Sequence, residues 1–140
     1  MKITICGSIK FVKEMRECKG KLESLGHEVV VPLSAEMNQD KEYWNNFKKK
    51  DFEKFLNVKR ERMIGHFDEV KSSEAILVLN CDKEGNKNYI GGNTFLEMAI
   101  ALEHGKKIFL LNPASKDSPY IEEIESMHPI VLNGDLNQIS

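Results

Sequence analysis

Apolar residues along the chain gather either in short continuous runs or at helical intervals, and the two patterns alternate from one end to the other. Short apolar runs bounded by glycine, proline or asparagine predict buried strands, here over residues 3–6, 28–32, 74–80, 106–111 and 129–132. Apolar residues three or four positions apart predict helices, here over residues 8–25, 34–73, 93–104 and 119–127. The pattern therefore predicts strands that alternate with helices.

A chain in which strands alternate with helices folds into a doubly wound parallel sheet with helices on both faces. For such a sheet of five strands, the default flavodoxin-like order is 2-1-3-4-5. We therefore predict the α/β class, as a flavodoxin-like or Rossmann-like three-layer sandwich with a five-stranded parallel sheet, formed by residues 1–140 as one domain. The topology then reverses between strands 1 and 3, so the loops at residues 7–10 and 80–93 should meet in the crevice where such folds bind ligands.

Composition and charge narrow the classes of partner. Hydrophobic residues make up 41% and charged residues 30%, as in ordinary globular proteins, and the net charge of −2 gives no general attraction to nucleic acid or acidic membranes. We find no charged leader and no long apolar stretch, so we expect a cytoplasmic protein. The three cysteines are widely spaced, and His27, His104 and His128 show no ligand-like spacing. We therefore expect reduced thiols, no metal and no cofactor.

The segment at residues 34–73 differs from the rest because it is strongly charged and rich in aromatic residues. We predict one or two helices with a break or kink at Gly65, and an inner face formed by the large apolar side chains Tyr43, Trp44, Phe47, Phe52, Phe55, Leu56, Met63 and Phe67. Acidic residues interrupt the basic runs at 48–50 and 59–62, which favours a solvated, salt-bridged face. The aromatic residues are more typical of core or dimer contacts than of base-stacking platforms.

The strongest chemical signal is a glycine pair followed by two small polar residues and, soon after, a carboxylate near the start of a helix. Glycine lets backbone approach a ligand closely, and a helix N-terminus favours anions. We expect Gly91, Gly92, Asn93 and Thr94 to contact a substrate, and Glu97, in the first helical turn, to act on it. The structural alternative is a simple cap, in which Asn93 or Thr94 accepts hydrogen bonds from first-turn amides.

A second candidate lies just after the first predicted strand, where Gly7, Ser8, Ile9 and Lys10 lead into a helix. Backbone amides, the Ser8 hydroxyl and the Lys10 ammonium are groups that hold a phosphate at such a turn. The alternative is an ordinary tight turn in which Ser8 caps the helix.

Two titratable residues, His66 and Asp68, lie shortly before the third predicted strand. Histidine titrates near neutral pH, and burial can tune a carboxylate, so either residue can serve as a general acid or base if it faces the crevice. The alternative is that both belong to a solvated helix end.

Taken together, these motifs resemble the nucleoside 2-deoxyribosyltransferase superfamily, including its 2′-deoxynucleoside 5′-phosphate N-hydrolase branch. The likeness rests on the first loop at 6–10, the strand segment at 73–80 and the helix at 94–106, in which Ala101 and Lys106 follow Glu97 at the family's spacing. It spans most of the chain except residues 34–62, and we treat the helical segment 34–73 as family-variable. The resemblance implies that Glu97 is the nucleophile, that the first loop holds a nucleotide phosphate, and that the protein forms a homodimer or a larger assembly.

The chain also departs from the family at three places. His66 stands where the family usually carries an aspartate, Thr4 stands where the N-hydrolases carry a tyrosine, and the glycine pair replaces an aspartate of many transferases. We expect a small-molecule enzyme that cleaves or transfers at the N-glycosidic bond of a nucleoside or (deoxy)nucleoside 5′-monophosphate, through a glycosyl-enzyme intermediate on Glu97. A nucleotide-binding or sensor protein of the same fold, and a phosphoribohydrolase-like enzyme, are the alternatives.

Overall fold

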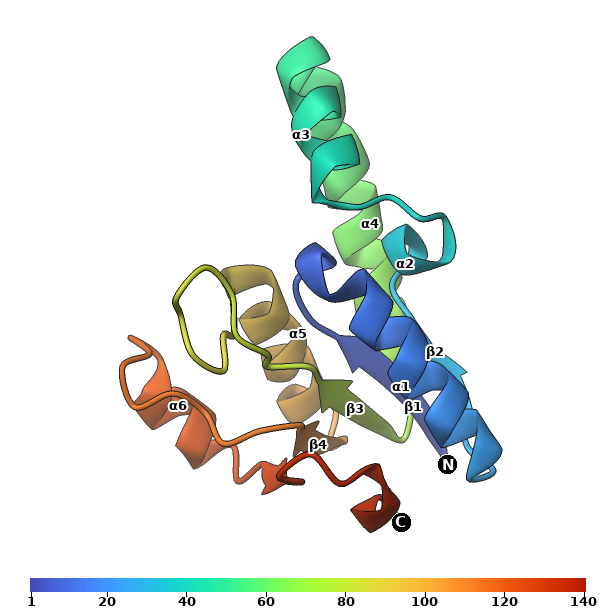
Figure 1. Cartoon of the computed structure of the whole chain (residues 1–140), viewed down its shortest axis with the longest axis vertical. Helices are drawn as coiled ribbons and strands as arrows, with labels where there is room; N and C mark the ends of the chain where they lie inside the picture. The colour runs from blue at the N-terminus through green and yellow to red at the C-terminus, as the bar shows by residue number, and fades with distance from the viewer.

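The computed structural model describes residues 1–140 and contains one sheet of five parallel strands in the order β2-β1-β3-β4-β5 (Figure 1). The strands are β1 (Lys2–Cys6), β2 (Glu28–Val30), β3 (Ala75–Val78), β4 (Lys107–Leu110) and β5 (Ile130–Val131). The central strand β3 pairs with β1 and β4, so that Ile76 lies opposite Thr4 on one side and Ile108 on the other. The predicted fold class and strand order are confirmed.

Helices cover both faces of the sheet, which makes three layers (Figure 1). They are α1 (Val12–Ser24), α2 (Leu33–Glu36), α3 (Lys41–Lys50), α4 (Phe52–Ser72), α5 (Gly92–Glu103) and α6 (Ile121–Ser126), with the short 3-10 turns η1 (Ile9–Phe11) and η2 (Leu136–Gln138). On one face, Met15 and Leu22 of α1 belong to the core. On the other, the core contains Val70 of α4, Met98 of α5 and Ile124 of α6.

Each strand sends alternate side chains to opposite faces, and β3 shows how the sequence accomplishes this. All four of its residues are buried, as expected for a parallel strand with helices on both sides. Leu77 joins the core beneath α1, whereas Ile76 and Val78 join the core beneath α4 and α5. The continuous apolar run that predicted a central strand therefore serves two separate cores.

The segment 34–73 departs from its prediction in three ways. It forms α2, α3 and α4 rather than one or two helices, and α4 runs through Gly65 without a break. A new helix begins instead after Asp51, whose carboxylate accepts a hydrogen bond from the Lys54 amide at 3.1 Å. Because the α3–α4 hairpin extends away from the sheet (Figure 1), part of the predicted inner face is exposed: Tyr43, Phe52 and Leu56 are 41%, 53% and 47% exposed. No helix in the structure has both the length and the apolar composition needed to cross a membrane.

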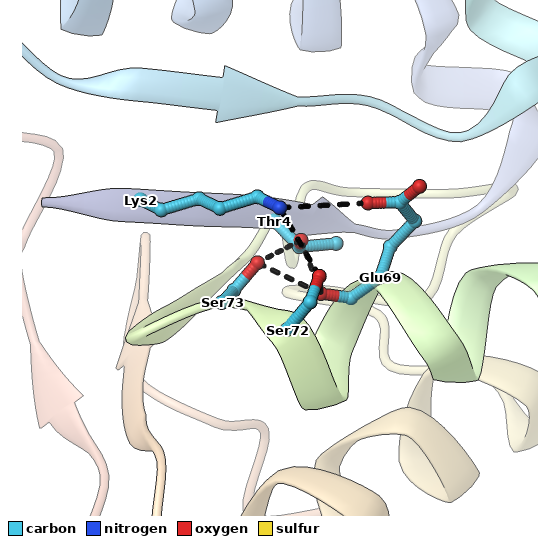
Figure 2. A network of polar contacts seen from close by, with 5 residues as sticks. All are labelled: Lys2, Thr4, Glu69, Ser72 and Ser73. Atoms are coloured by element: carbon cyan, nitrogen blue, oxygen red, sulfur yellow. Dashed lines mark hydrogen bonds and ion pairs between the residues drawn. The ribbon is translucent and has the colours of Figure 1, made fainter.

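A buried polar network holds the C-terminal end of α4 against β1 (Figure 2). The hydroxyl oxygens of Thr4 and Ser73 lie 2.6 Å apart, and both hydroxyls lie within hydrogen-bond distance of the Glu69 carbonyl, at 3.2 and 2.8 Å. At the edge of the network, the Lys2 ammonium donates to the Ser72 hydroxyl at 3.1 Å. Because Thr4 is fully buried, these bonds fix how α4 lies on the sheet.

Candidate active site

A cavity of about 550 Å³ opens beyond the carboxyl ends of β1, β2 and β3. The first loop contributes Gly7, Ser8 and Ile9 to its lining, and the segment after β3 contributes Gly91, Gly92, Asn93, Thr94 and Glu97. The two loops also meet outside the cavity, where the Lys10 ammonium lies 4.0 Å from the Glu84 carboxylate. The segments predicted to converge at the topological switch point therefore do lie together.

Gly91 lies close to a tyrosine side chain. A Cβ atom at position 91 would lie 2.8 Å from the Tyr89 hydroxyl oxygen, at the far end of that side chain, so a larger residue would require the Tyr89 ring to shift. Gly91 is also the N-cap of α5, and no side chain caps this helix. The capping alternative for Asn93 and Thr94 is therefore wrong, and the first amides of α5 remain available at the cavity.

The carboxylate of Glu97 is the most deeply buried charged group of the cavity. Its residue is 2% exposed, and its Oε2 lies 2.9 Å from the Nε2 atom of His66 on α4. Because α5 begins at Gly92, Glu97 belongs to the second helical turn, which corrects the prediction of the first turn. The pair combines a buried carboxylate with a group that carries an exchangeable proton, as general acid–base and nucleophilic chemistry requires.

A third side chain, that of Cys6, completes this cluster from the end of β1. Its Sγ atom lies 3.7 Å from the Nε2 atom of His66, and its residue is fully buried. Burial raises the pKa of the Cys6 thiol well above its usual range, and the negative charge of Glu97 adds to the effect. The thiol is therefore protonated at neutral pH.

The structure separates the remaining predicted residues from this cluster. The Asp68 side chain is 67% exposed and lies 3.8 Å from the Lys71 ammonium on the outer side of α4. Lys10 does not line the cavity, and Ser8 accepts a hydrogen bond from the Lys10 amide at 3.2 Å as the cap of η1. Of the two acid–base candidates, His66 alone lies beside the buried carboxylate.

Another part of the cavity wall contains residues that the sequence did not single out as a site. The Trp44 indole and the Arg62 guanidinium both donate to the Ser34 hydroxyl, at 3.2 and 3.3 Å, and Arg62 lies over the Trp44 ring at 5.2 Å. All three line the cavity, together with Phe55 and Lys59. The basic run at 59–62 is therefore more than a solvated face, and Trp44 and Phe55 are wall residues as well as packing residues. Periodicity gave no such signal, because the wall joins three helices.

No protein-family model matches the chain, and no curated protein does. Several solved structures match, and two of them do so over 94% of the chain. The 2-deoxyribosyltransferase of Bacillus psychrosaccharolyticus has a TM-score of 0.57 and 17% identity over 98% of its own length. The CMP N-glycosidase BcmB of Clostridium botulinum has a TM-score of 0.52 and 16% identity over 88% of its length. At these identities the likeness shows the shared fold.

Proposed function

We propose that the protein is an enzyme of the nucleoside 2-deoxyribosyltransferase superfamily that cleaves or transfers at the N-glycosidic bond of a nucleoside or nucleoside 5′-monophosphate. The observation that carries the proposal is the buried Glu97 carboxylate, 2.9 Å from His66, on the wall of a cavity that two glycine-containing loops also line. The names of the two structural neighbours, an N-glycosidase and a deoxyribosyltransferase, support the same chemistry.

In this reaction Glu97 attacks the anomeric carbon of the sugar. The Oε2 atom is engaged by His66, so the Oε1 atom is the natural nucleophile. A bond forms between Oε1 and C1′ while the bond from C1′ to the base nitrogen breaks, and the base leaves with the electron pair. A buried carboxylate also stabilises the oxocarbenium-like charge that develops on the sugar.

His66 is placed to transfer a proton to the departing base. When it is protonated, its Nε2–H donates to the Glu97 carboxylate across 2.9 Å. Formation of the ester removes the negative charge that holds this proton, so it becomes available to the departing base. The neutral imidazole can then accept a proton from the water that hydrolyses the ester, or a second base can resolve it in a transfer.

The cavity has separate surfaces for the two ends of such a substrate. The uncapped N-terminus of α5 and the first loop present backbone amides, which suit a 5′-phosphate or sugar hydroxyls. The wall formed by Trp44, Arg62 and Ser34 offers guanidinium donors that lie over the buried Trp44 ring, and such donors suit the polar edge of a nucleobase. This division assigns the phosphate to the glycine loops and the base to α3 and α4.

The test is incubation of the protein with a panel of nucleosides and nucleoside 5′-monophosphates, followed by chromatography for free base. We expect at least one substrate to release base, and a Glu97→Gln variant to release it about a thousandfold more slowly or less. The variant keeps the size of the side chain, so an unchanged melting temperature would confirm that folding is intact. Tight binding of a nucleotide with no base released by the wild-type protein would select the sensor alternative.

We also propose that the protein forms a homodimer through the α3–α4 hairpin. Tyr43, Phe52 and Leu56 are 41%, 53% and 47% exposed there, and aromatic residues are enriched in interface cores. Light scattering should give twice the mass of the chain, and a Phe52→Ser, Leu56→Ser variant should give the monomer mass. A wild-type monomer at high concentration would refute the interface.

A further inference from the structure

Three side chains with metal-ligating atoms converge from three separate elements. They are the Cys6 thiol at the end of β1, the His66 imidazole on α4 and the Glu97 carboxylate on α5. Their Sγ, Nε2 and carboxylate oxygen atoms all lie within 4.8 Å of one another. His66 is central, because its Nε2 atom lies 3.7 Å from the sulfur and 2.9 Å from the Glu97 oxygen.

Two of the three separations are close to those of a tetrahedral zinc site, and the third, between the sulfur and the carboxylate oxygen, is within 4.8 Å. Zinc binds sulfur at about 2.3 Å and nitrogen or oxygen at about 2.0 to 2.2 Å, which places tetrahedral ligand atoms about 3.3 to 3.6 Å apart. The sulfur–nitrogen distance of 3.7 Å is close to that range, and the nitrogen–oxygen distance of 2.9 Å is slightly short of it. A small opening of the His66–Glu97 pair would therefore admit the ion.

The charges of the three groups suit the same ion. A Cys6 thiolate and a Glu97 carboxylate carry two negative charges, which one divalent zinc neutralises, while His66 contributes a neutral nitrogen. Neutrality matters here because Cys6 is fully buried and Glu97 is 2% exposed. The thiolate also favours zinc over magnesium or calcium, which prefer oxygen ligands.

We propose that Cys6, His66 and Glu97 form a zinc site whose fourth position opens into the cavity, and that zinc bound there blocks the reaction by neutralising the Glu97 carboxylate. Binding forms bonds from zinc to sulfur, nitrogen and oxygen, and releases the thiol proton to solvent. Because His66 and Glu97 line the cavity, water or a substrate group can take the fourth position. Zinc binding stands independently of the proposed enzymatic activity, whereas inhibition by zinc rests on it.

Cobalt(II) reports on such a site directly, since it substitutes for zinc and its bond to a thiolate gives a near-ultraviolet charge-transfer band. Titration of the reduced, chelator-treated protein should give this band at one cobalt per chain, together with the visible bands of a tetrahedral ion. Zinc should displace cobalt and abolish both, with a Kd for zinc of about 1 μM or tighter. No band and no zinc binding up to millimolar concentrations would overturn the site.

Variants of the cysteines locate the site. Cys6→Ser should remove the charge-transfer band and weaken zinc binding by at least about a hundredfold, and His66→Gln should weaken binding similarly. The matched controls are Cys18→Ser and Cys81→Ser, because these thiols lie outside the cluster, and each should keep the band. Circular dichroism shows whether each variant folds, and His66→Gln keeps the test decisive if Cys6→Ser unfolds. A band that survives Cys6→Ser but is lost in the Cys18 or Cys81 variant would refute the assignment.

A kinetic measurement tests the second half of the proposal. Zinc should inhibit base release in proportion to site occupancy, and a chelator should restore it, in both the wild-type protein and Cys18→Ser. Persistent activity at full occupancy would refute the blocking role. If the protein bound cobalt through Cys6 but released no base under any condition, the proposed function would fail while the zinc site would stand.

Discussion

The two faces of the sheet are built for different purposes. Beneath α1, the strands present a continuous apolar surface that includes Ile3, Ile5 and Leu77. Beneath α4 and α5, the same strand β1 presents Thr4 and Cys6, and the helices add His66 and the buried Glu97. The face beneath α1 therefore stabilises the fold without burying polar side chains. The face beneath α4 and α5 buries polar groups, which need hydrogen-bond partners in fixed positions.

The polar face also positions the His66–Glu97 pair. Thr4 and Cys6 lie two residues apart on β1 and so point to the same face. Thr4 holds the end of α4 through Ser73 and the Glu69 carbonyl (Figure 2), and Cys6 contacts His66 about one turn earlier in the helix. The polar network and the contact between Cys6 and His66 are thus consecutive contacts of one helix with one strand.

The largest expected effect is a difference in the rate of base release between variants of His66 and Asp68, which lie two positions apart on α4. His66→Asn should lower the rate of base release by about a hundredfold or more, because it removes the group that manages the proton. Asp68→Asn should leave the rate within about twofold, since its side chain is exposed and contacts Lys71. Steady-state kinetics on both variants would check this, and equal losses would contradict the assignment to His66.

A pair of core substitutions on β3 probes the two faces directly. Leu77→Ala and Ile76→Ala should each lower the free energy of unfolding by about 2 to 5 kcal/mol, because both residues are fully buried. Ile76→Ala should also lower the turnover of folded protein, because Ile76 shares its core with Cys6 and Met98. Urea unfolding and kinetics at low temperature would measure both quantities. If Leu77→Ala lowered turnover as much as Ile76→Ala, the claim that only the face beneath α4 and α5 supports the site would be contradicted.

The polar network should give a smaller effect. Thr4→Val preserves the shape of the side chain but leaves Ser73 without one partner, which should cost about 1 to 2 kcal/mol in unfolding free energy. Turnover should fall as well, since α4 also carries His66. Thr4→Ser restores the hydroxyl and should recover most of both losses. Loss of stability without any change in turnover would show that the network does not position His66.

The smallest effect concerns the half-buried thiol of α1, on the apolar face. Burial, with a contribution from Cys81, raises the pKa of Cys18 to about 11, whereas an unfolded thiol titrates at about 8.5. Below the unfolded value both states keep the proton. As pH rises further, the unfolded chain loses it first, so the free energy of unfolding falls between pH of about 9 and 11. Cys18→Ser should show a shallower fall in urea unfolding at pH 8 and 10, and identical slopes would contradict the shift.

Local patterns were enough to predict the sheet but not the helical hairpin. The apolar runs that became β1, β3 and β4 are buried on both faces, so their sequence signal is strong. In segment 34–73, helical periodicity was present, but burial depends on where a helix lies relative to the sheet. Phe52 and Leu56 follow the helical pattern and are nevertheless exposed, because the hairpin projects beyond the other layers.

The sequence by itself determined the strand order, the convergence of the two loops and the place of Glu97 beside them, because these follow from the order of elements along the chain. Only the tertiary structure decided that His66, and not Asp68, lies beside Glu97. His66 and Asp68 are two positions apart on one helix, so their side chains point about 200° apart around its axis. The rotation of α4 on the sheet therefore determines which of them lies beside Glu97. That rotation is set by contacts such as Thr4 with Ser73, which are 69 positions apart in the chain. The contact of Cys6 with His66 likewise depends on tertiary structure, because the spacing of residues along the chain does not predict contacts between distant segments.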